Sequence, residues 1–176
     1  TKQKLEKKYK WKLEEFDKTY TEKEHKTSDI IWICWFQGMD NAPDLVKKCY
    51  ESVVKNNPGK KVIVLTEKNI SDYVTFPEYI VTKWKQGVIT HTHMTDWLDA
   101  TVLCTGTAPE YFFDSDLFFF QTLKPGRDGH ASYISSWLME AKTNNKILMA
   151  SRELCYEYWK TNNTMLDYFL LHDFMS

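Results

Sequence analysis

A short apolar segment near the middle of the chain carries two carboxylates that could do chemistry. Asp96 stands at the edge of this segment, and Asp99 lies within it, between Trp97-Leu98 and Val102-Leu103. A buried carboxylate costs free energy unless a cation or hydrogen-bond donors meet it. The pattern therefore favours a metal or sugar site at Asp99. The alternative is an aspartate that caps a turn at the end of a strand.

Two histidines precede these carboxylates with the spacing His91-x-His93-x-x-Asp96. On a strand, a spacing of two would place both imidazoles on one face. No third ligand of known position accompanies them, so we expect a loop that lines the site. His172 lies on an apolar helical segment near the end of the chain, where a histidine commonly packs at the edge of the core.

A literal Asp-x-Asp occurs at Asp114-Ser115-Asp116. Asp and Ser commonly form turns, and we interpret this segment as a turn that enters the next strand. It also resembles the opening motif of haloacid-dehalogenase-type phosphatases, with Asp114 as nucleophile and Asp116 as acid/base. The helix expected after Phe120 argues against that alternative, which needs a Rossmann domain downstream.

The elements that would position these residues begin with the apolar run 30–36, which is typical of a strand buried on both faces. Gln37-Gly38 ends the run, and Pro43 opens a helix through about Asn56. A turn and a second buried strand, Lys61–Leu65, follow. Strand–helix–strand indicates a parallel sheet, whose ligands bind beyond the carboxyl ends of the strands.

The rest of the chain divides into short segments. We expect short helices and loops over 70–94, strands at 97–103 and 117–120, and mostly helix from 132 onward. Apolar residues recur every three or four positions in residues 1–27, which predicts a charged amphipathic helix preceding a domain of residues 28–176. Six lysines and one glutamate occur among its first twelve residues. The helix either packs one face on the domain or rests on an anionic membrane surface.

Composition narrows the class of protein. A chain of 176 residues has room for one domain with a sizeable core. The net charge of −1 argues against a nucleic-acid partner. Its four cysteines lack zinc spacing, and no apolar run is long enough to span a bilayer. These features predict a cytoplasmic protein with reduced thiols. Peripheral contact to the inner face of the plasma membrane through residues 1–12 is the expectation that the basic helix adds, where it rests on a membrane rather than on the domain.

Five segments, in this order, resemble the capsular polysaccharide synthesis glycosyltransferases, which are similar to the family 32 sugar transferases. They are IWICWFQG at 31–38, NNPG at 56–59, WLDATV at 97–102, SSW at 135–137 and DYFLLH at 167–172. The resemblance covers about residues 28–176. It implies an α/β, GT-A-like (Rossmann-like) nucleotide-sugar-binding sheet with helices on both faces and a helical C-terminal part.

The resemblance also implies a nucleotide-diphosphate-sugar donor, which we take to be a UDP-sugar, and a divalent Mn²⁺ or Mg²⁺. Asp96 matches the aspartate that touches donor-sugar hydroxyls in relatives. Asp99 matches the first aspartate of the metal-binding Asp-x-Asp, and Thr101 stands at the second position. His172 matches a C-terminal histidine that joins the metal. A metal held by carboxylate offsets the charge of a leaving nucleotide diphosphate.

The nucleotide is expected to border the end of the first strand, at Trp35, Phe36, Gln37 and Gly38. An aromatic ring can stack on uracil, and glycine permits close approach of the backbone. Trp35 is equally compatible with the core. Further along the chain, Ser136 and Trp137 are candidates for contact with the donor, and Ser135 and Ser136 could instead cap a helix.

Two departures from the pattern affect the donor site. Thr101 replaces a carboxylate. An arginine-bearing helix and a Gly-Gly turn are also absent between Asp96 and Trp97. We hypothesise that this sequence omits residues there, which predicts a wide gap between Asp96 and Trp97.

The function these observations favour is transfer of a sugar, with retention, to a lipid-linked saccharide acceptor. A non-catalytic nucleotide-sugar-binding or assembly subunit is the alternative that Thr101 favours, and the phosphatase is a third.

Overall fold

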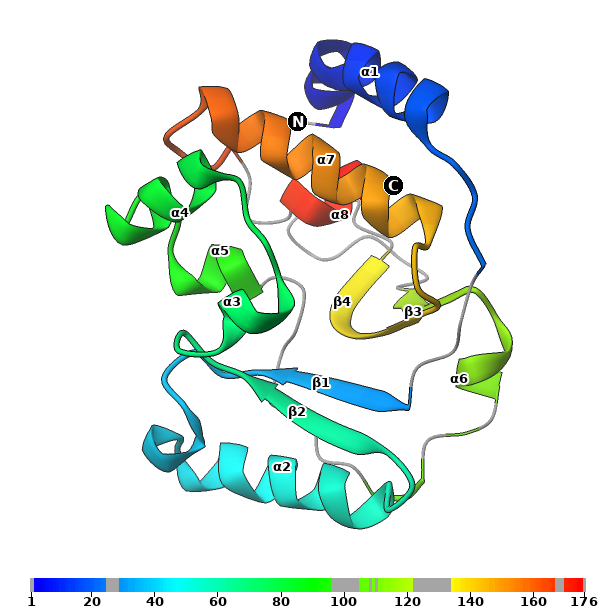
Figure 1. The fold of residues 1–176 in the computed structure, drawn as a ribbon, viewed down its shortest axis with the longest axis vertical. Coiled ribbons are helices and arrows are strands. Elements are labelled where there is room, and N and C mark those ends of the chain that lie inside the picture. Colours follow the sequence, from blue (N-terminus) through cyan, green and yellow to red (C-terminus); the bar gives the residue numbers. More distant parts are fainter. Residues whose placement is uncertain are drawn as a thin grey trace.

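The computed structural model describes residues 2–24, 29–95, 105–107, 109, 111–121, 134–166 and 170–175 (Figure 1). These residues form a mixed α/β protein. Its elements are α1 (Lys2–Thr19), β1 (Ile30–Cys34), the 3-10 turn η1 (Met39–Asn41), α2 (Asp44–Asn56), β2 (Lys61–Leu65), α3 (Ile70–Tyr73), α4 (Glu78–Lys85), α5 (His91–Thr95), α6 (Tyr111–Asp114), β3 (Leu117–Gln121), β4 (Ile134–Ala141), α7 (Lys146–Thr161) and α8 (Leu170–Met175).

The predicted strand–helix–strand unit is confirmed. β1 and β2 pair in parallel, in a register that runs from Ile30 opposite Lys61 to Cys34 opposite Leu65. Between them, α2 begins directly after Pro43 and buries Val46 and Cys49. Figure 1 shows α2 running along one side of the strand pair. A parallel pair requires such a crossover, and the proline and the asparagine–proline–glycine turn mark its limits.

The prediction of helix from residue 132 is wrong for β4. β3 and β4 form an antiparallel pair, with a register shift between Phe119 and Phe120. The second half of β4, Leu-Met-Glu-Ala, consists of good helix formers, which explains the wrong prediction. Pairing with β3 overrides this local preference, as tertiary context commonly does for strands. Ser135 and Ser136 therefore lie inside a strand and do not cap a helix.

The wide GT-A or Rossmann-like sheet expected from the resemblance is not evident among the described residues. The four strands there form two separate pairs, β1–β2 and β3–β4. Among the described strands, β3 hydrogen-bonds to β4 rather than to β1 or β2, so these strands alone form no continuous sheet. The strand predicted at 97–103 lies outside the described residues, as does the junction between Asp96 and Trp97.

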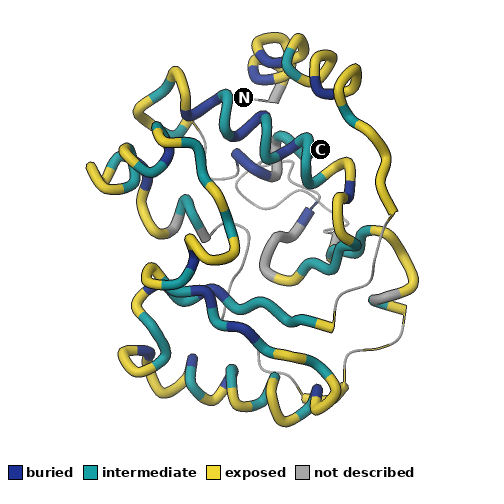
Figure 2. Tube along the Cα trace, in the orientation of Figure 1, coloured by how far each residue is buried: buried dark blue, intermediate teal, exposed yellow. Residues whose placement is uncertain are grey.

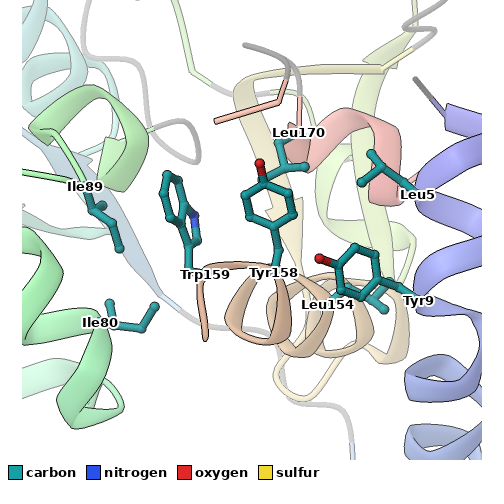
Figure 3. Close-up of a cluster of buried hydrophobic side chains, with 8 residues drawn as sticks. All are labelled: Leu5, Tyr9, Ile80, Ile89, Leu154, Tyr158, Trp159 and Leu170. Carbon is teal, nitrogen blue, oxygen red and sulfur yellow. The ribbon is translucent and has the colours of Figure 1, made fainter. Parts of the chain in front are cut away.

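A core of helices lies at the other end of the molecule from α2. It joins side chains of α1, α4, α7 and α8 with Ile89 (Figure 3). In Figure 2, buried positions concentrate on α7 and on the β1–β2 pair. The predicted amphipathic helix is present as α1, whose Leu5, Tyr9 and Phe16 are buried. No helix in the described part of the chain is long and apolar enough to cross a membrane.

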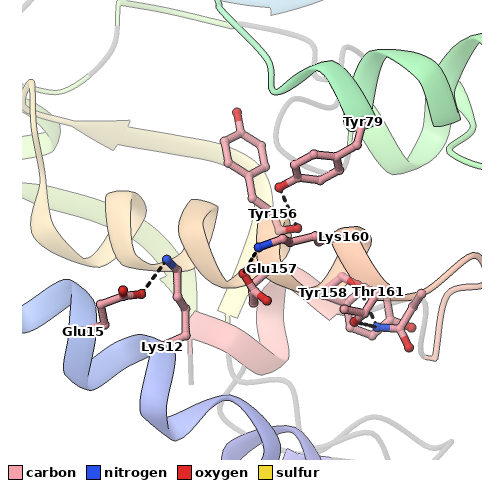
Figure 4. A network of polar contacts seen from close by, with 9 residues as sticks. Lys12, Glu15, Tyr79, Tyr156, Glu157, Tyr158, Lys160 and Thr161 are labelled. Carbon is pink, nitrogen blue, oxygen red and sulfur yellow. Dashed lines mark hydrogen bonds and ion pairs between the residues drawn. The ribbon is translucent and has the colours of Figure 1, made fainter.

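Polar contacts hold α4 against the C-terminal half of α7. Tyr79 Oη donates to the Tyr156 carbonyl at 3.0 Å (Figure 4). The ammonium of Lys83 donates to the carbonyls of Trp159 and Asn162, at the end of α7. A cation is favourable there because helix carbonyls carry partial negative charge and lack intrahelical partners. The contacts of Lys83 therefore give it a structural role at the end of α7.

Candidate functional site

The loops that follow β1 and β2 lie next to each other where they continue from the two strands. Trp35 N–H donates to the Leu65 carbonyl at 2.9 Å, and Glu67 N–H donates to the Phe36 carbonyl at 3.1 Å. The parallel ladder thus continues past both strands. The two loops meet at the carboxyl edge, where open α/β sheets bind their ligands.

The first loop is a tight turn that only glycine accommodates without strain. Gly38 has a φ of 80° and donates its N–H to the Trp35 carbonyl at 2.9 Å. Asn41 Nδ2 donates to the Gln37 carbonyl at 3.0 Å and fixes the turn from the other side. No heavy atom lies within 4 Å of the position that a Cβ would take at Gly38. The conformation, rather than crowding, explains the glycine.

The second loop is organised by Asn69. Its Oδ1 accepts from Thr66 N–H at 2.7 Å and from Thr66 Oγ1 at 3.1 Å, while its Nδ2 donates to the Val64 carbonyl at 3.0 Å. The sequence analysis did not single out Asn69. An asparagine four residues beyond a buried strand could have signalled such a turn, because its side chain mimics a backbone turn.

Phe36 supports this edge from within the core. Its side chain is 3% exposed. The ring lies 5.2 Å from the Trp84 ring and is stacked on His91 at 5.2 Å. A ring enclosed in this way has little surface to offer a ligand. Phe36 instead ties the end of β1 to α4 and α5.

Trp35 carries an unsatisfied donor at the same edge. The residue is half-buried, and its indole Nε1 is buried without an acceptor among the described residues. A buried N–H without a partner costs about 1–3 kcal/mol. Because the atom itself is buried, a ligand would have to displace the groups that cover it before supplying an acceptor.

The two histidines of the His-x-His pattern diverge. They lie on the helix α5 rather than on a strand or in a loop. His91 stacks on Phe36, and its Nε2 lies 3.8 Å from Glu67 Oε2. The His93 ring packs 5.5 Å from Trp159, its Nδ1 accepts from Thr90 N–H, and burial lowers its pKa. Residues two apart on an α-helix point to nearly opposite sides, so His91 and His93 do not converge on one metal ion.

Asp114 is the last residue of α6, and only Ser115 and Asp116 form the bend that leads into β3, so the predicted turn is confirmed for these two residues alone. Asp116 Oδ1 accepts from Lys142 Nζ at 2.8 Å, and its carbonyl accepts from Asn145 Nδ2 at 3.1 Å. These contacts join the turn to the end of β4 and the start of α7. The described residues after it form an antiparallel pair and helices, not the Rossmann domain that the phosphatase alternative requires.

Glu140 on β4 is a second residue that the sequence analysis passed over. Its Oε2 is buried without a hydrogen-bond partner among the described residues. Burial raises the pKa of this carboxyl, with a smaller opposing effect from Lys142. Nothing in the spacing of β4 signals it, because the burial arises from pairing with β3, where Glu140 lies opposite Phe118.

The remaining predicted site residues are not described at the level of side chains. Asp96, Asp99 and Thr101 lie outside the described residues. Ser136 and Trp137 lie in β4, and His172 lies in α8, but only their backbones are described. Among the described residues, no group of three His, Cys, Asp or Glu side chains could hold a metal ion. The structure thus brings together residues 35–38 with Thr66, Glu67, Asn69 and His91.

The fold and this edge define a mixed α/β protein with a candidate ligand site beyond its parallel strands. Residues 1–176 match the model of the family described as capsular polysaccharide synthesis protein. The chain belongs to this family, which places it in capsular polysaccharide synthesis. No curated protein and no solved structure matched the chain.

Proposed function

We propose that the protein is a glycosyltransferase of capsule synthesis. It transfers a sugar, with retention, from a nucleotide-diphosphate-sugar to a growing polysaccharide on a lipid carrier, and UDP is the proposed nucleotide. The observation that carries the proposal is the pair of adjoining loops at the carboxyl edge of β1–β2, in a chain of a capsule synthesis family. Capsule synthesis consists of joining sugars, and this edge is where α/β folds bind nucleotides.

The nucleotide would lie across the two loops. Gly38 lets the backbone approach it closely, and Asn41 and Asn69 hold the loops in place before it binds. Preorganised loops reduce the entropy lost on binding. Binding would displace the groups that cover the buried indole N–H of Trp35, which would then donate to an oxygen of the nucleotide, and Phe36 would support the loop from the core. Gln37, Ser136 and Trp137 complete the proposed donor contacts.

The proposed reaction centre is formed by Asp96, which would bind donor-sugar hydroxyls, and Asp99. Mn²⁺ or Mg²⁺ remains part of the proposal, with Asp99, Thr101 and His172 as its ligands. A bound divalent ion would offset the charge that develops on the departing diphosphate.

A non-catalytic subunit that binds the nucleotide-sugar is the second candidate. Thr101 favours it, because a hydroxyl replaces a charged ligand in the metal motif. The two candidates differ in turnover: both bind the donor, but only the transferase breaks the bond between the sugar and the diphosphate.

Turnover of a panel of radiolabelled nucleotide-sugars, with Mn²⁺ and with EDTA, tests this proposal. We expect slow, metal-dependent release of the nucleoside diphosphate from one UDP-sugar. Saturable donor binding without turnover, even with lipid-linked acceptor, would overturn the transferase in favour of the binding subunit. Release of phosphate from a substrate that carries no sugar would support the phosphatase, provided that Asp114→Asn abolishes this release.

Trp35→Phe tests the part of the proposal that rests on the indole N–H. It removes one hydrogen bond and retains an aromatic ring, so we expect nucleotide affinity to fall roughly 2- to 10-fold. Trp11→Phe, on the exposed face of α1, is the matched control and should bind as the wild type does. Equal affinities in all three proteins would remove Trp35 from the donor site.

A further inference from the structure

The inward face of α1 is fully used by the protein itself. Leu5, Tyr9 and Phe16 are 3%, 4% and 8% exposed. The Tyr9 ring meets Phe174 of α8 edge-on at 5.8 Å, and its Oη accepts from Asn162 Nδ2 at 3.1 Å. The helix is therefore fixed on α7 and α8 by its apolar side. It has no second apolar side left to insert into a bilayer.

The opposite face of α1 presents cations around an exposed indole. We call this face the α1 outer surface. It consists of Lys4, Lys7, Lys8, Trp11 and Lys18, and the ion-paired Glu14 and Glu15 lie beside them on the same face. At 100° per residue, Trp11 lies between the directions of Lys4 and Lys7, away from the three buried side chains. Trp11 is 51% exposed. Tryptophan usually buries most of its large ring, so this exposure needs a reason.

Within the protein, the lysines of this surface have few partners, although Lys8 Nζ lies over the Tyr9 ring, 5.1 Å from its centroid. Lys4 and Lys8 are four residues apart, a spacing at which like charges repel. Among the described residues, Lys10 and Lys12 have carboxylate partners in Glu14 and Glu15, at 3.9 and 2.9 Å, but no carboxylate lies within ion-pair distance of Lys4, Lys7 or Lys8.

An anionic lipid surface complements both features of the α1 outer surface. Lysines near anionic headgroups are attracted to them, and tryptophan favours the interface because its ring is apolar and its N–H is polar. The acidic residues in the second half of α1 do not cancel this charge: Glu15 is paired with Lys12, and Asp17 accepts from Lys146 at 2.7 Å (Figure 4 shows the Lys12–Glu15 contact).

We propose that the α1 outer surface docks the protein peripherally on an anionic lipid bilayer. The inference goes beyond the donor site and does not depend on it. Docking would be electrostatic and reversible, with Trp11 at the headgroups and the apolar side of α1 still packed on α7. This differs from an amphipathic helix that inserts its apolar face.

Co-sedimentation with vesicles tests the proposal. The wild-type protein is titrated with vesicles of phosphatidylglycerol and phosphatidylcholine, and with phosphatidylcholine alone. The variant carries Lys4→Gln, Lys7→Gln and Lys8→Gln. Each lysine near such a surface strengthens binding about fivefold, so the triple change predicts binding weaker by on the order of 100-fold. Trp11→Ala should weaken binding without a change of charge.

The matched control removes the same charge at the opposite end of the molecule (Figure 1). It carries Lys48→Gln, Lys55→Gln and Lys61→Gln, at exposed positions of α2 and β2. We expect it to bind phosphatidylglycerol vesicles as the wild type does, and salt to weaken both. The thermal midpoints of both variants check folding, which the outward-facing changes should leave intact.

Three results would overturn the proposal. The first is the absence of binding to phosphatidylglycerol vesicles, and the second is equal loss of binding in the α1 variant and the α2–β2 control. The third is binding that persists in phosphatidylcholine alone. Tighter binding to a nucleic acid than to vesicles, lost in the same α1 variant, would assign the surface to that partner instead.

Discussion

Replacement of Phe36 by alanine tests whether the carboxyl edge of β1–β2 is built from the core outward. Phe36 is 3% exposed and contacts Trp84 and His91, each with its ring centre 5.2 Å away. Burial this complete predicts a loss of about 3–5 kcal/mol, because truncation removes apolar contact and leaves a cavity. At about 2–4 °C for each kcal/mol in a chain of this size, the thermal midpoint should fall by about 6–20 °C.

Urea denaturation followed by circular dichroism, together with thermal scans, measures this loss. Leu45→Ala on α2 is the control, since Leu45 is 66% exposed and its truncation should change stability by no more than about 0.5 kcal/mol. Should Phe36→Ala unfold no more easily than Leu45→Ala, Phe36 would not be the core support of the site. Nucleotide binding is compared only under conditions where Phe36→Ala is folded.

Three further predictions concern stability and reactivity. Asn145 caps α7, and its Oδ1 accepts from two backbone N–H groups at 3.1 and 3.2 Å. Asn145→Ala should lower the free energy of unfolding by about 1 kcal/mol in urea denaturation, and an unchanged free energy would contradict the cap. Glu140→Gln should stabilise the protein at pH 7, because burial raises the pKa of this carboxyl and its charged form therefore opposes folding. The gain in stability should shrink as pH falls towards 4 and the wild-type carboxyl becomes protonated. A gain that is the same at every pH would contradict this cause. Cys34 should resist iodoacetamide at pH 8 until urea is added, because burial raises the pKa of its thiol to about 11, and rapid labelling of the native protein in a mass spectrum would refute this.

The first half of the chain could be predicted because each of its elements carries a local signal. The apolar runs that form β1 and β2 are bounded by Gly38, Pro43 and the turn at 57–59, and α2 fits between them. In addition, a parallel pair admits few connections, which makes the strand–helix–strand unit readable from order alone.

The second half depends on contacts between distant residues, which a single sequence does not display. β4 ends in helix formers and becomes a strand because β3 supplies its hydrogen bonds. The polar residues around His91 and His93 predict a loop, yet both histidines lie on α5. Their rings pack against Phe36 and Trp159, respectively. In both cases the packing partner lies at least 13 residues away in the sequence (134 − 121 for the nearest β3–β4 pair), so no local pattern reveals it.

The candidate site could be predicted only at its strand ends. Residues 35–38 follow a buried strand, and a ligand edge is expected there on topology alone. The roles of Asn41 and Asn69 emerge from hydrogen bonds within the loops. The buried N–H of Trp35 results from tertiary packing, which the residue type alone does not predict. Asp96 and Asp99 stay a prediction of the sequence.

Calorimetric titration of UDP into the protein, with and without Mn²⁺, tests the central claim most directly. It is run beside Asp99→Asn and beside Glu51→Gln, which makes the same carboxylate-to-amide change at an exposed position of α2. A donor site predicts that the wild type and Glu51→Gln bind UDP only with Mn²⁺ and that Asp99→Asn does not. Absence of UDP binding in either condition, or equal binding by all three proteins, would contradict it.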